Sequence, residues 1–271
     1  MKFLTLNTHS WMEENPQQKF EDLLTDILEK QYDLICFQEI NQGIESPVVP
    51  VNDLYHPTPS AEPIHQDHYV RCLVEKLEEE GLSYHWTWAY NHIGYDRYHE
   101  GVAVLSRTPI QASELLVSDV NDPTDYHTRR IAIVETQVDG KEIAVASVHL
   151  SWWDKGFQQE WARLEERFSQ LQKPLILAGD FNNPAGQEGY EAILASPLAL
   201  QDSFIEARQT KGTYTVGPGI DGWDDNQVPL RIDYVFTSKE WVIERLEVVF
   251  DGSNQPLVSD HYGLSADLYL P

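Results

Sequence analysis

Residues 175–184 read LILAGDFNNP, and both the fold and the candidate site are organised around them. The first four residues form a continuous apolar run, which is typical of an interior strand in a covered sheet. Gly179 lets the backbone turn, and Asp180 and Asn182 follow at the strand end, where open α/β sheets place their sites. Asp180 can orient or deprotonate a water, and the Asn182 amide can donate to a phosphoryl oxygen. The alternative is an ordinary loop in which both side chains cap their own backbone.

The composition of the 271 residues, 41% of them hydrophobic, fits one globular domain over residues 1–271. The formal net charge is −25, with 19 Lys and Arg against 44 Asp and Glu. Because non-specific nucleic-acid binding depends on Lys and Arg, this balance disfavours a high-affinity DNA binder. A nuclease whose nucleic-acid groove is neutralised by bound metal remains an alternative function.

The N-terminus and the cysteines bear on the compartment. Residues 1–6 lack the long apolar region of a signal peptide, and no apolar run is long enough to span a membrane. Cys36 and Cys72 lack metal-ligand spacing and do not indicate a disulfide scaffold. We therefore expect a cytoplasmic protein, with a secreted form whose signal has been removed as the alternative. We also expect a monomer without a protein partner.

The chain begins with a predicted strand–helix–strand unit. The first strand ends at Asn7, apolar residues at helical spacing predict an amphipathic helix over 16–31 capped by Asn15, and a second buried strand ends at Glu39. A crossover of this length makes the two strands parallel. Asn7 and Glu39 should then emerge at the same edge of one sheet.

Residues 41–67 contain five prolines and no clear period, which predicts a long loop of the kind that is usually functional or disordered. We expect it to be ordered and, because it leaves directly from Glu39, to overhang that residue. Apolar spacing predicts further helices over 70–81 and 157–171. Strands are expected over 84–90, 100–107, 129–138, 142–150, 175–178, 231–236 and 241–250, with Asp139-Gly140 as a hairpin turn.

Polar residues stand at the boundaries of apolar strands at six points of the chain. They are Asn7, Glu39, His149, Asp180 with Asn182, Asp233, and Asp260 with His261. Each alone could be an ordinary core residue, surface residue or turn. On one sheet edge they would supply what metal-assisted phosphoester hydrolysis needs, because carboxylates bind Mg²⁺ through oxygen and the ion offsets phosphoryl charge. An acid behind a histidine also stabilises its protonated form.

With these motifs in this order, the sequence resembles the endonuclease/exonuclease/phosphatase superfamily, which includes pancreatic-type deoxyribonucleases, exonuclease III-type repair enzymes, inositol polyphosphate 5-phosphatases, deadenylases and neutral sphingomyelinases. The resemblance covers nearly the whole chain, and GDFN at 179–182 followed by SDH at 259–261 is its most specific feature. The other matching segments are 6–7, 38–39, 100–106, 148–150 and 231–234. The resemblance implies an α/β fold, a four-layer α/β/β/α sandwich in which two mixed β-sheets pack face to face between helices.

The resemblance also implies a metal site. Glu39 matches the principal metal ligand of the superfamily, with Asn7 beside it and Asp260 as a further acid on the metal side. The implied ion is Mg²⁺, with Mn²⁺ as the alternative.

The remaining implied roles concern water and phosphate. Asp180 matches the residue that aligns or activates the attacking water, and Asn182 matches the amide that holds the phosphate. His261, paired with Asp233, matches the histidine that contacts the scissile phosphate. Whether the base is Asp180 or a histidine stays open, because their titrations are coupled.

Three further residues have implied roles on the phosphate side. His149 matches a second phosphate-side residue, and Glu100 matches the carboxylate that orients it in the deoxyribonucleases. Arg129 matches an arginine near the phosphate, with Arg130 as the alternative for that position. We therefore expect hydrogen bonds from His261 to Asp233 and from His149 to Glu100, each raising the pKa of its histidine.

The aromatic pair after His149 and the other histidines carry weaker signals. Trp152 and Trp153 could stack on a leaving group, although a core role is expected for at least one of them. Histidines 56, 65, 68 and 92 lie in or near loops without partner spacing, so we expect them to be solvated.

Together these features predict a Mg²⁺-dependent phosphoesterase, with a phosphodiesterase favoured, that hydrolyses its substrate by in-line attack of water. The alternatives are an endo- or exonuclease acting on DNA or RNA and, from another class, a catalytically dead phosphate-binding module. A small or membrane-presented substrate is favoured over long nucleic acid, because of the net charge and because the 41–67 loop and the tryptophans should narrow the site.

Overall fold

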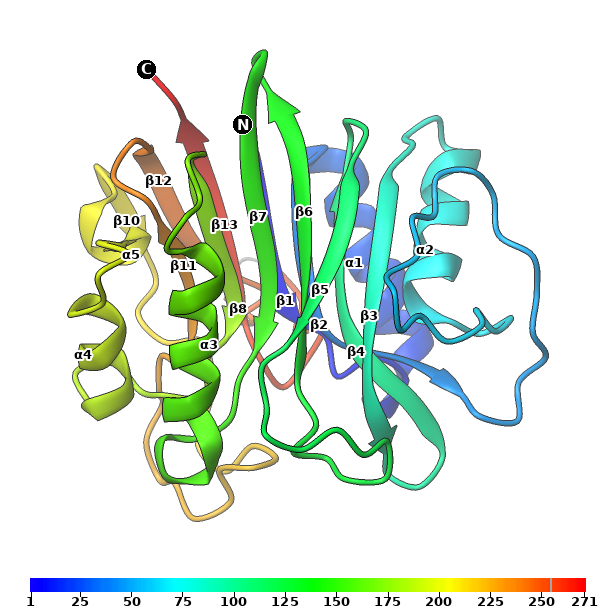
Figure 1. The fold of residues 1–271 in the computed structure, drawn as a ribbon. Helices are drawn as coiled ribbons and strands as arrows, with labels where there is room; N and C mark the ends of the chain where they lie inside the picture. Colours follow the sequence, from blue (N-terminus) through cyan, green and yellow to red (C-terminus); the bar gives the residue numbers. More distant parts are fainter. Residues whose placement is uncertain (254) are drawn as a thin grey trace.

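Two mixed β-sheets pack face to face in the computed structural model, which describes residues 1–253 and 255–271 (Figure 1). One sheet has the strand order β10-β12-β13-β1-β2-β4-β3, and the other has the order β5-β6-β7-β8-β11-β9. The first sheet comprises β1 (Lys2–Asn7), β2 (Leu34–Gly43), β3 (His85–Gly94), β4 (Tyr98–Ser106), β10 (Gln209–Lys211), β12 (Val242–Val249) and β13 (Gly263–Tyr269). The second comprises β5 (Gln111–Leu116), β6 (Arg130–Val138), β7 (Lys141–His149), β8 (Leu175–Asp180), β9 (Gln201–Asp202) and β11 (Asp233–Thr237).

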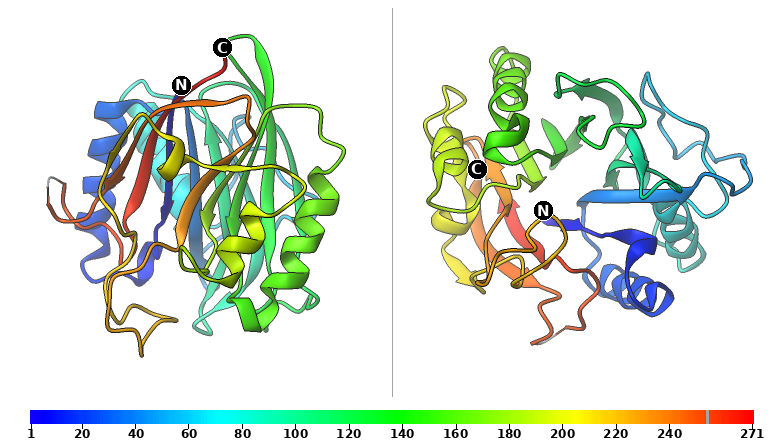
Figure 2. Two further views of the ribbon diagram at one scale, coloured as in Figure 1. Left: turned by 90° about the vertical axis from the view of Figure 1, so that its left-hand side faces the viewer. Right: turned by 90° about the horizontal axis from the view of Figure 1, so that it is seen from below.

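Helices cover the outer face of each sheet, as Figure 2 shows from below. The helices are α1 (Pro16–Lys30), α2 (Tyr69–Glu79), α3 (Gln158–Phe168), α4 (Glu188–Leu194) and α5 (Ser203–Glu206), with short turns η1 (Ser10–Met12) and η2 (Trp153–Phe157). One buried apolar cluster lies between the sheets, a second joins α1 and α2 to the first sheet, and a third joins α3 and α4 to the second. The predicted four-layer α/β/β/α sandwich is confirmed.

The predicted strand–helix–strand unit at the start of the chain is also confirmed. β1 and β2 are parallel, with Asn7 opposite Gln38, and α1 begins with Pro16 in its first turn. The expected cap is wrong in one respect: Asn15 has a left-handed φ of 56°, and its side chain makes no capping hydrogen bond. The Asp139-Gly140 hairpin turn is confirmed, since both residues have the positive φ that a tight hairpin requires.

The expectation for residues 41–67 is wrong. β2 continues to Gly43, where it still pairs with β4, and no residue from 44 to 67 lines the cavity described below. The backbone of this segment pairs with the edge strand β3 at Tyr55 and Trp86, and Figure 1 shows the segment beside α2 and β3. The long loop therefore covers the β3 edge of the first sheet and does not overhang Glu39.

The polar strand ends gather at one end of the sandwich, the lower end in Figure 1. β1 and β2 end there, as do the parallel strands β7 and β8, whereas β11 and β13 begin there because they run antiparallel to β8 and β1. The topology therefore brings together residues that lie more than 200 positions apart in the sequence. Within the described residues, no helix has the length and apolar character needed to cross a membrane.

His68 is a buried histidine that should make the stability of the fold depend on pH. Its Nδ1 accepts a hydrogen bond from the Arg71 backbone N–H at the start of α2, and its ring packs against Trp86 and Trp88. Burial, assisted by the charge of Arg71, lowers the pKa of His68 from 6.5 to about 3. As the pH falls below 6.5 the unfolded chain takes up a proton that the folded chain refuses, which costs about 2 kcal/mol of folding free energy at pH 5.

We expect His68→Asn, which keeps a capping acceptor, to remove this dependence. Urea unfolding at pH 7 and pH 5 measures it: the wild type should lose about 2 kcal/mol more between the two pH values than the variant. Equal losses in the two proteins would contradict this assignment.

Candidate functional site

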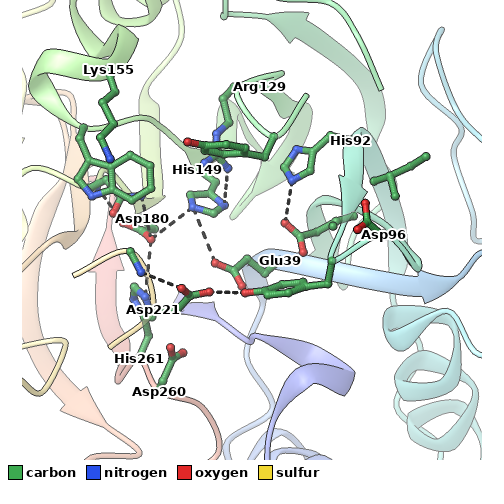
Figure 3. A pocket seen from close by; sticks show the side chains of 18 of the residues that line it. Glu39, His92, Asp96, Arg129, His149, Lys155, Asp180, Asp221, Asp260 and His261 are labelled. Carbon is green, nitrogen blue, oxygen red and sulfur yellow. Dashed lines mark hydrogen bonds and ion pairs between the residues drawn. The ribbon is translucent and has the colours of Figure 1, made fainter. Parts of the chain in front are cut away.

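A cavity of about 480 Å³ opens at the end of the sandwich where the polar strand ends gather (Figure 3). Its walls come from the ends of both sheets, from the β3–β4 turn, and from loops that contain Tyr126, Trp152 and Asp221. Of the predicted site residues, it is lined by Glu39, Glu100, Arg129, His149, Trp152, Asp180, Asn182, Asp260 and His261. Asn7 and Asp233 are buried directly behind this surface.

Asp180 lies at the centre of the site, at the end of β8. It pairs in register with His149 of the parallel strand β7 and with Asp233 of the antiparallel strand β11. The preceding Gly179 has a φ of 141°, and a Cβ there would lie 2.1 Å from the Val148 carbonyl oxygen, so only glycine lets β8 pass this close to β7. Burial, with a contribution from Asp233, raises the pKa of Asp180 to about 7.

Glu39 reaches the cavity because a β-bulge interrupts β2. The register between β2 and β4 shifts between Phe37 and Ile40, and Glu39 has a left-handed φ of 54°. Asn7 Nδ2 donates to Glu39 Oε1 at 2.8 Å and lies 3.2 Å from Asp180 Oδ2. The prediction that Asn7 and Glu39 emerge together is therefore confirmed. Burial and the nearby Glu100 raise the pKa of Glu39 to about 8.

His261 and Asp233 form the predicted acid–histidine pair. The Nδ1 atom of His261 lies 3.0 Å from Asp233 Oδ2, and its Nε2 lies 3.8 Å from Asp180 Oδ2. Burial alone would lower the pKa of His261, but the carboxylates of Asp233 and Asp180 outweigh it and raise that pKa well above the ordinary value. The predicted hydrogen bond is confirmed, and the two carboxylates favour the charged form of the imidazole.

The predicted hydrogen bond between Glu100 and His149 is wrong. The Nδ1 atom of His149 contacts Arg129 Nη1 at 3.1 Å, and Glu100 instead faces His92 at 3.4 Å. Because a guanidinium can only donate, Nδ1 of His149 is the acceptor, so its proton is on Nε2. Burial and the charges of Arg129 and His261 hold the pKa of His149 well below its usual value, opposite to the expected shift.

Neutral His149 therefore presents an Nε2–H donor toward the acids. Its Nε2 lies 3.6 Å from Asp180 Oδ2 and 3.9 Å from Glu39 Oε1. Arg129 is buried, and within the described residues no carboxylate lies within ion-pair distance of it. Its Nε is buried and has no hydrogen-bond partner among those residues. An unpaired buried guanidinium beside a cavity is suited to bind an anion.

Asn182 lines the cavity and also holds the Asp180 carboxylate in place. Its backbone N–H donates to Asp180 Oδ1 at 2.8 Å, and its Nδ2 contacts the Leu150 carbonyl oxygen at 3.0 Å and Asp180 Oδ2 at 3.4 Å. The indole of Trp223 donates to its Oδ1. For the amide to bind a phosphate, the weaker contact with Asp180 would have to be replaced.

Asp260 lines the cavity, and its position depends on two residues that the sequence did not single out. Its backbone N–H donates to Glu13 Oε1 at 2.9 Å, and its carboxylate lies 3.8 Å from His9 Nδ1. Glu13 also contacts His9 at 3.0 Å and ion-pairs with Lys19. Burial opposes the charged form of His9, but Glu13, Glu39 and Asp260 together raise its pKa to about 9.

The carboxylates around Glu39 fit a hard divalent cation. Glu39, Asp180 and Asp260 all line the cavity, and the raised pKa of Glu39 reflects buried negative charge without a sufficient counter-charge. Oxygen donors of this kind are the ligands that Mg²⁺ and Mn²⁺ take in proteins. By the spacing of their ligand atoms, two groups of the described residues could hold an ion: His9 with Glu13 and Asp260, and Asp180 with Asp233 and His261. Asn7 orients the nearby Glu39 carboxylate from behind.

Several expectations for the remaining aromatic residues and histidines are corrected. Trp153 packs against the cluster under α3, as expected for one of the two tryptophans, whereas Trp152 lines the cavity with the Lys155 ammonium 4.6 Å from its ring centre. His65, His68 and His92 are buried, so the prediction that they are solvated is wrong. His92 lines the cavity. Its pairing opposite Glu100 on the neighbouring strand could have predicted this placement, but that pairing was not recognised in the sequence.

Comparison with known proteins places the chain in a family. The model of the Endonuclease/Exonuclease/phosphatase family matches residues 11–261. A solved endonuclease/exonuclease/phosphatase family protein from Leptotrichia buccalis is 31% identical, with all of both chains covered and a TM-score of 0.87. No curated protein matches the sequence.

Two more distant structures share the fold. A mannosyl-6-phosphatase from Bacteroides thetaiotaomicron is 15% identical over all of both chains, with a TM-score of 0.67. The human Nocturnin catalytic domain with bound sulfate is 18% identical over all of this chain and 93% of its own, with a TM-score of 0.68. From the family model and the Leptotrichia structure together, the chain belongs to the endonuclease/exonuclease/phosphatase family.

Proposed function

We propose that the chain is a metal-dependent phosphoesterase that cleaves small phosphodiesters by in-line attack of water. One observation carries the proposal: Asp180 lies within 4 Å of Asn7, His149 and His261 on the wall of a single cavity. A buried carboxyl group with a pKa of about 7 can accept a proton from water at neutral pH. The filled set of site residues also argues against a catalytically dead module.

The surrounding side chains stabilise charge, bind the phosphate and orient Asp180. The charged imidazole of His261, held by Asp233, stabilises negative charge that develops on the phosphoryl oxygens. Neutral His149 donates from Nε2, and Arg129 both fixes that tautomer and offers its unpaired charge to the phosphate. Asn182 and Asn7 keep the Asp180 carboxylate oriented. A divalent ion at Glu39 would supply further positive charge to the phosphoryl group.

The proposal of a small substrate rests on the cavity walls. The Tyr95 hydroxyl donates to Asp221, which joins the β3–β4 turn to a loop that lies 126 residues later and narrows the opening. Acidic residues outnumber positively charged ones on the walls: Glu39, Asp96, Glu100, Asp180, Asp221, Asp224 and Asp260 stand against Arg129, Lys155 and His261. Since a nucleic-acid backbone needs a basic track, these walls disfavour a long polyanion.

A side-by-side assay at one salt concentration tests the substrate class. We would compare plasmid DNA, poly(A) RNA, a phosphocholine lipid, an inositol phosphate and an aryl phosphodiester, each with Mg²⁺ and with Mn²⁺. We expect turnover of one or more small or lipid substrates at rates well above those for DNA and RNA. Faster cleavage of either nucleic acid would replace this proposal with the nuclease alternative.

A further inference from the structure

Residues 217–229, here called the mouth loop, connect β10 to β11 at the end of the sandwich that holds the cavity, the lower end in Figure 1. The base of the loop is closed where Val216 pairs with Leu230, and Val216 also pairs with His261. Farther along, the loop contributes Asp221 to the cavity wall. The mouth loop is therefore attached directly to the candidate site.

Two further contacts hold the tip of the mouth loop across the cavity. The Tyr95 hydroxyl of the β3–β4 turn donates to Asp221. The next residue, Gly222, has a φ of 75°, and a Cβ there would lie 2.7 Å from the Trp152 ring, so the backbone packs directly against that indole. These contacts fix the position of Trp223, which follows immediately.

Trp223 is placed to act on the site and contributes little to the core. It is half-buried, and in the part of the chain that the structure describes it belongs to none of the three buried apolar clusters and does not line the cavity. Its indole Nε1 instead lies 3.1 Å from the Oδ1 atom of Asn182, whose side chain is buried in the cavity wall. The tryptophan thus reaches the site through one hydrogen bond.

This hydrogen bond determines which way the Asn182 amide faces. An indole N–H can only donate, so the atom it contacts is the amide oxygen, and Nδ2 points the other way. There Nδ2 lies 3.0 Å from the Leu150 carbonyl oxygen and 3.4 Å from Asp180 Oδ2. Leu150 takes one of its two hydrogens, which leaves the second for Asp180 or for a phosphoryl oxygen. Trp223 and Leu150 together hold the amide at both ends.

We propose that Trp223 is a positioning residue that fixes the Asn182 amide for phosphoester hydrolysis, an inference that rests on the proposed function. Without the indole donor the amide is held from the Leu150 side alone and can tilt away from Asp180 and the phosphate. Because Asn182 also orients the Asp180 carboxylate, the loss affects the transition state more than the binding of substrate. The mouth loop would in this way link the closed cavity mouth to the geometry of the phosphate site.

A double-mutant cycle between Trp223→Phe and Asn182→Ala tests the inference. Trp223→Phe keeps an aromatic ring and removes the N–H donor. We would measure kcat and KM of the wild type, both single variants and the double variant with Mg²⁺ on bis(4-nitrophenyl) phosphate, whose good leaving group keeps slow rates measurable. Trp161→Phe is the matched control, because it also removes an indole hydrogen bond, to Glu165 on α3, away from the cavity.

We expect Trp223→Phe to lower kcat by about 10-fold or more with KM little changed, as loss of a residue that orients a functional group typically does. In the Asn182→Ala background the same substitution should change kcat by less than about twofold, because its partner is already gone. Trp161→Phe should behave as wild type.

Three results would overturn the inference while leaving the proposed function intact: an unchanged kcat in Trp223→Phe, a rise in KM alone, or the same loss of kcat in both backgrounds. Absence of wild-type turnover on this ester and on every other small substrate of the comparison above would instead refute the proposed function, and this inference with it. Thermal unfolding shows whether each variant is folded, and Trp223→Leu, which also lacks the donor, replaces Trp223→Phe in the cycle if that variant does not fold.

Discussion

Asp180→Asn should lower kcat/KM by about 10²–10⁴-fold, which corresponds to about 3–5 kcal/mol of transition-state stabilisation. The substitution keeps the shape of the side chain and an oxygen that can accept from the Asn182 backbone N–H. It removes the group that can take a proton from the attacking water and the charge that faces His261. The fold should survive, since a buried carboxylate beside Asp233 is replaced by a neutral amide.

Asp26→Asn is the matched control for this prediction. Asp26 is also a buried acid whose pKa is raised by burial, but it contacts Tyr32 and Gln255 away from the cavity. Initial rates should show lost activity for Asp180→Asn and near-normal activity for Asp26→Asn. Thermal unfolding should show that both variants are folded. Near-normal turnover in Asp180→Asn would remove this residue from the mechanism.

Glu39→Gln should abolish tight binding of the divalent ion. Glu39 supplies the carboxylate that the bulge in β2 directs into the cavity, and Asn7 already donates to it at 2.8 Å. Loss of a residue that only orients a ligand typically costs 10–100-fold in affinity, so loss of the ligand itself should cost more than about 10²-fold. Calorimetric titration with Mg²⁺ and electron paramagnetic resonance of bound Mn²⁺ measure this without reference to activity.

The pH dependence of the same titration gives a second readout for Glu39. Because its pKa without metal is about 8, the ion must displace a proton at neutral pH. Affinity should therefore rise by up to about tenfold per pH unit between pH 6 and 8, with release of about one proton per ion at pH 7. Unchanged affinity in Glu39→Gln, or binding in the wild type that does not depend on pH, would place the ion elsewhere.

The central part of the fold could be predicted because its signals are local. The strand that ends at Asp180 is an uninterrupted apolar run, and α1 combines a first-turn proline with helical apolar spacing. The short crossover forces β1 and β2 to be parallel, which places Asn7 beside Glu39. The order of the motifs then indicated the four-layer architecture.

The histidine partners could not be predicted because they depend on strand register. The β3–β4 turn includes Tyr95 and Asp96, both with positive φ, and this pair lacks the Asn-Gly or Asp-Gly signature of such turns. Without that signature, residues 91–99 were interpreted as a polar loop, although β3 extends to Gly94 and sets His92 opposite Glu100. The family resemblance had assigned Glu100 to His149, whereas the register places it opposite His92.

The contacts that shape the cavity walls could not be predicted from the sequence for a related reason. The Tyr95–Asp221 hydrogen bond joins residues 126 positions apart, and no local pattern specifies such a contact. The proline-rich segment after Gly43, in contrast, had a composition typical of a functional loop but pairs with the edge strand β3. Its composition predicted a long loop correctly, but the expected position over Glu39 was wrong.

Hydrolysis of an aryl phosphodiester by the metal-stripped protein, before and after addition of Mg²⁺, tests the central claim most directly. We predict negligible turnover in EDTA, recovery when Mg²⁺ is added in excess of the chelator, and no recovery in Glu39→Gln or Asp180→Asn at the same ion concentration. Turnover that is unaffected by EDTA, or that both variants retain, would contradict a metal-assisted attack of water organised by Asp180 and Glu39.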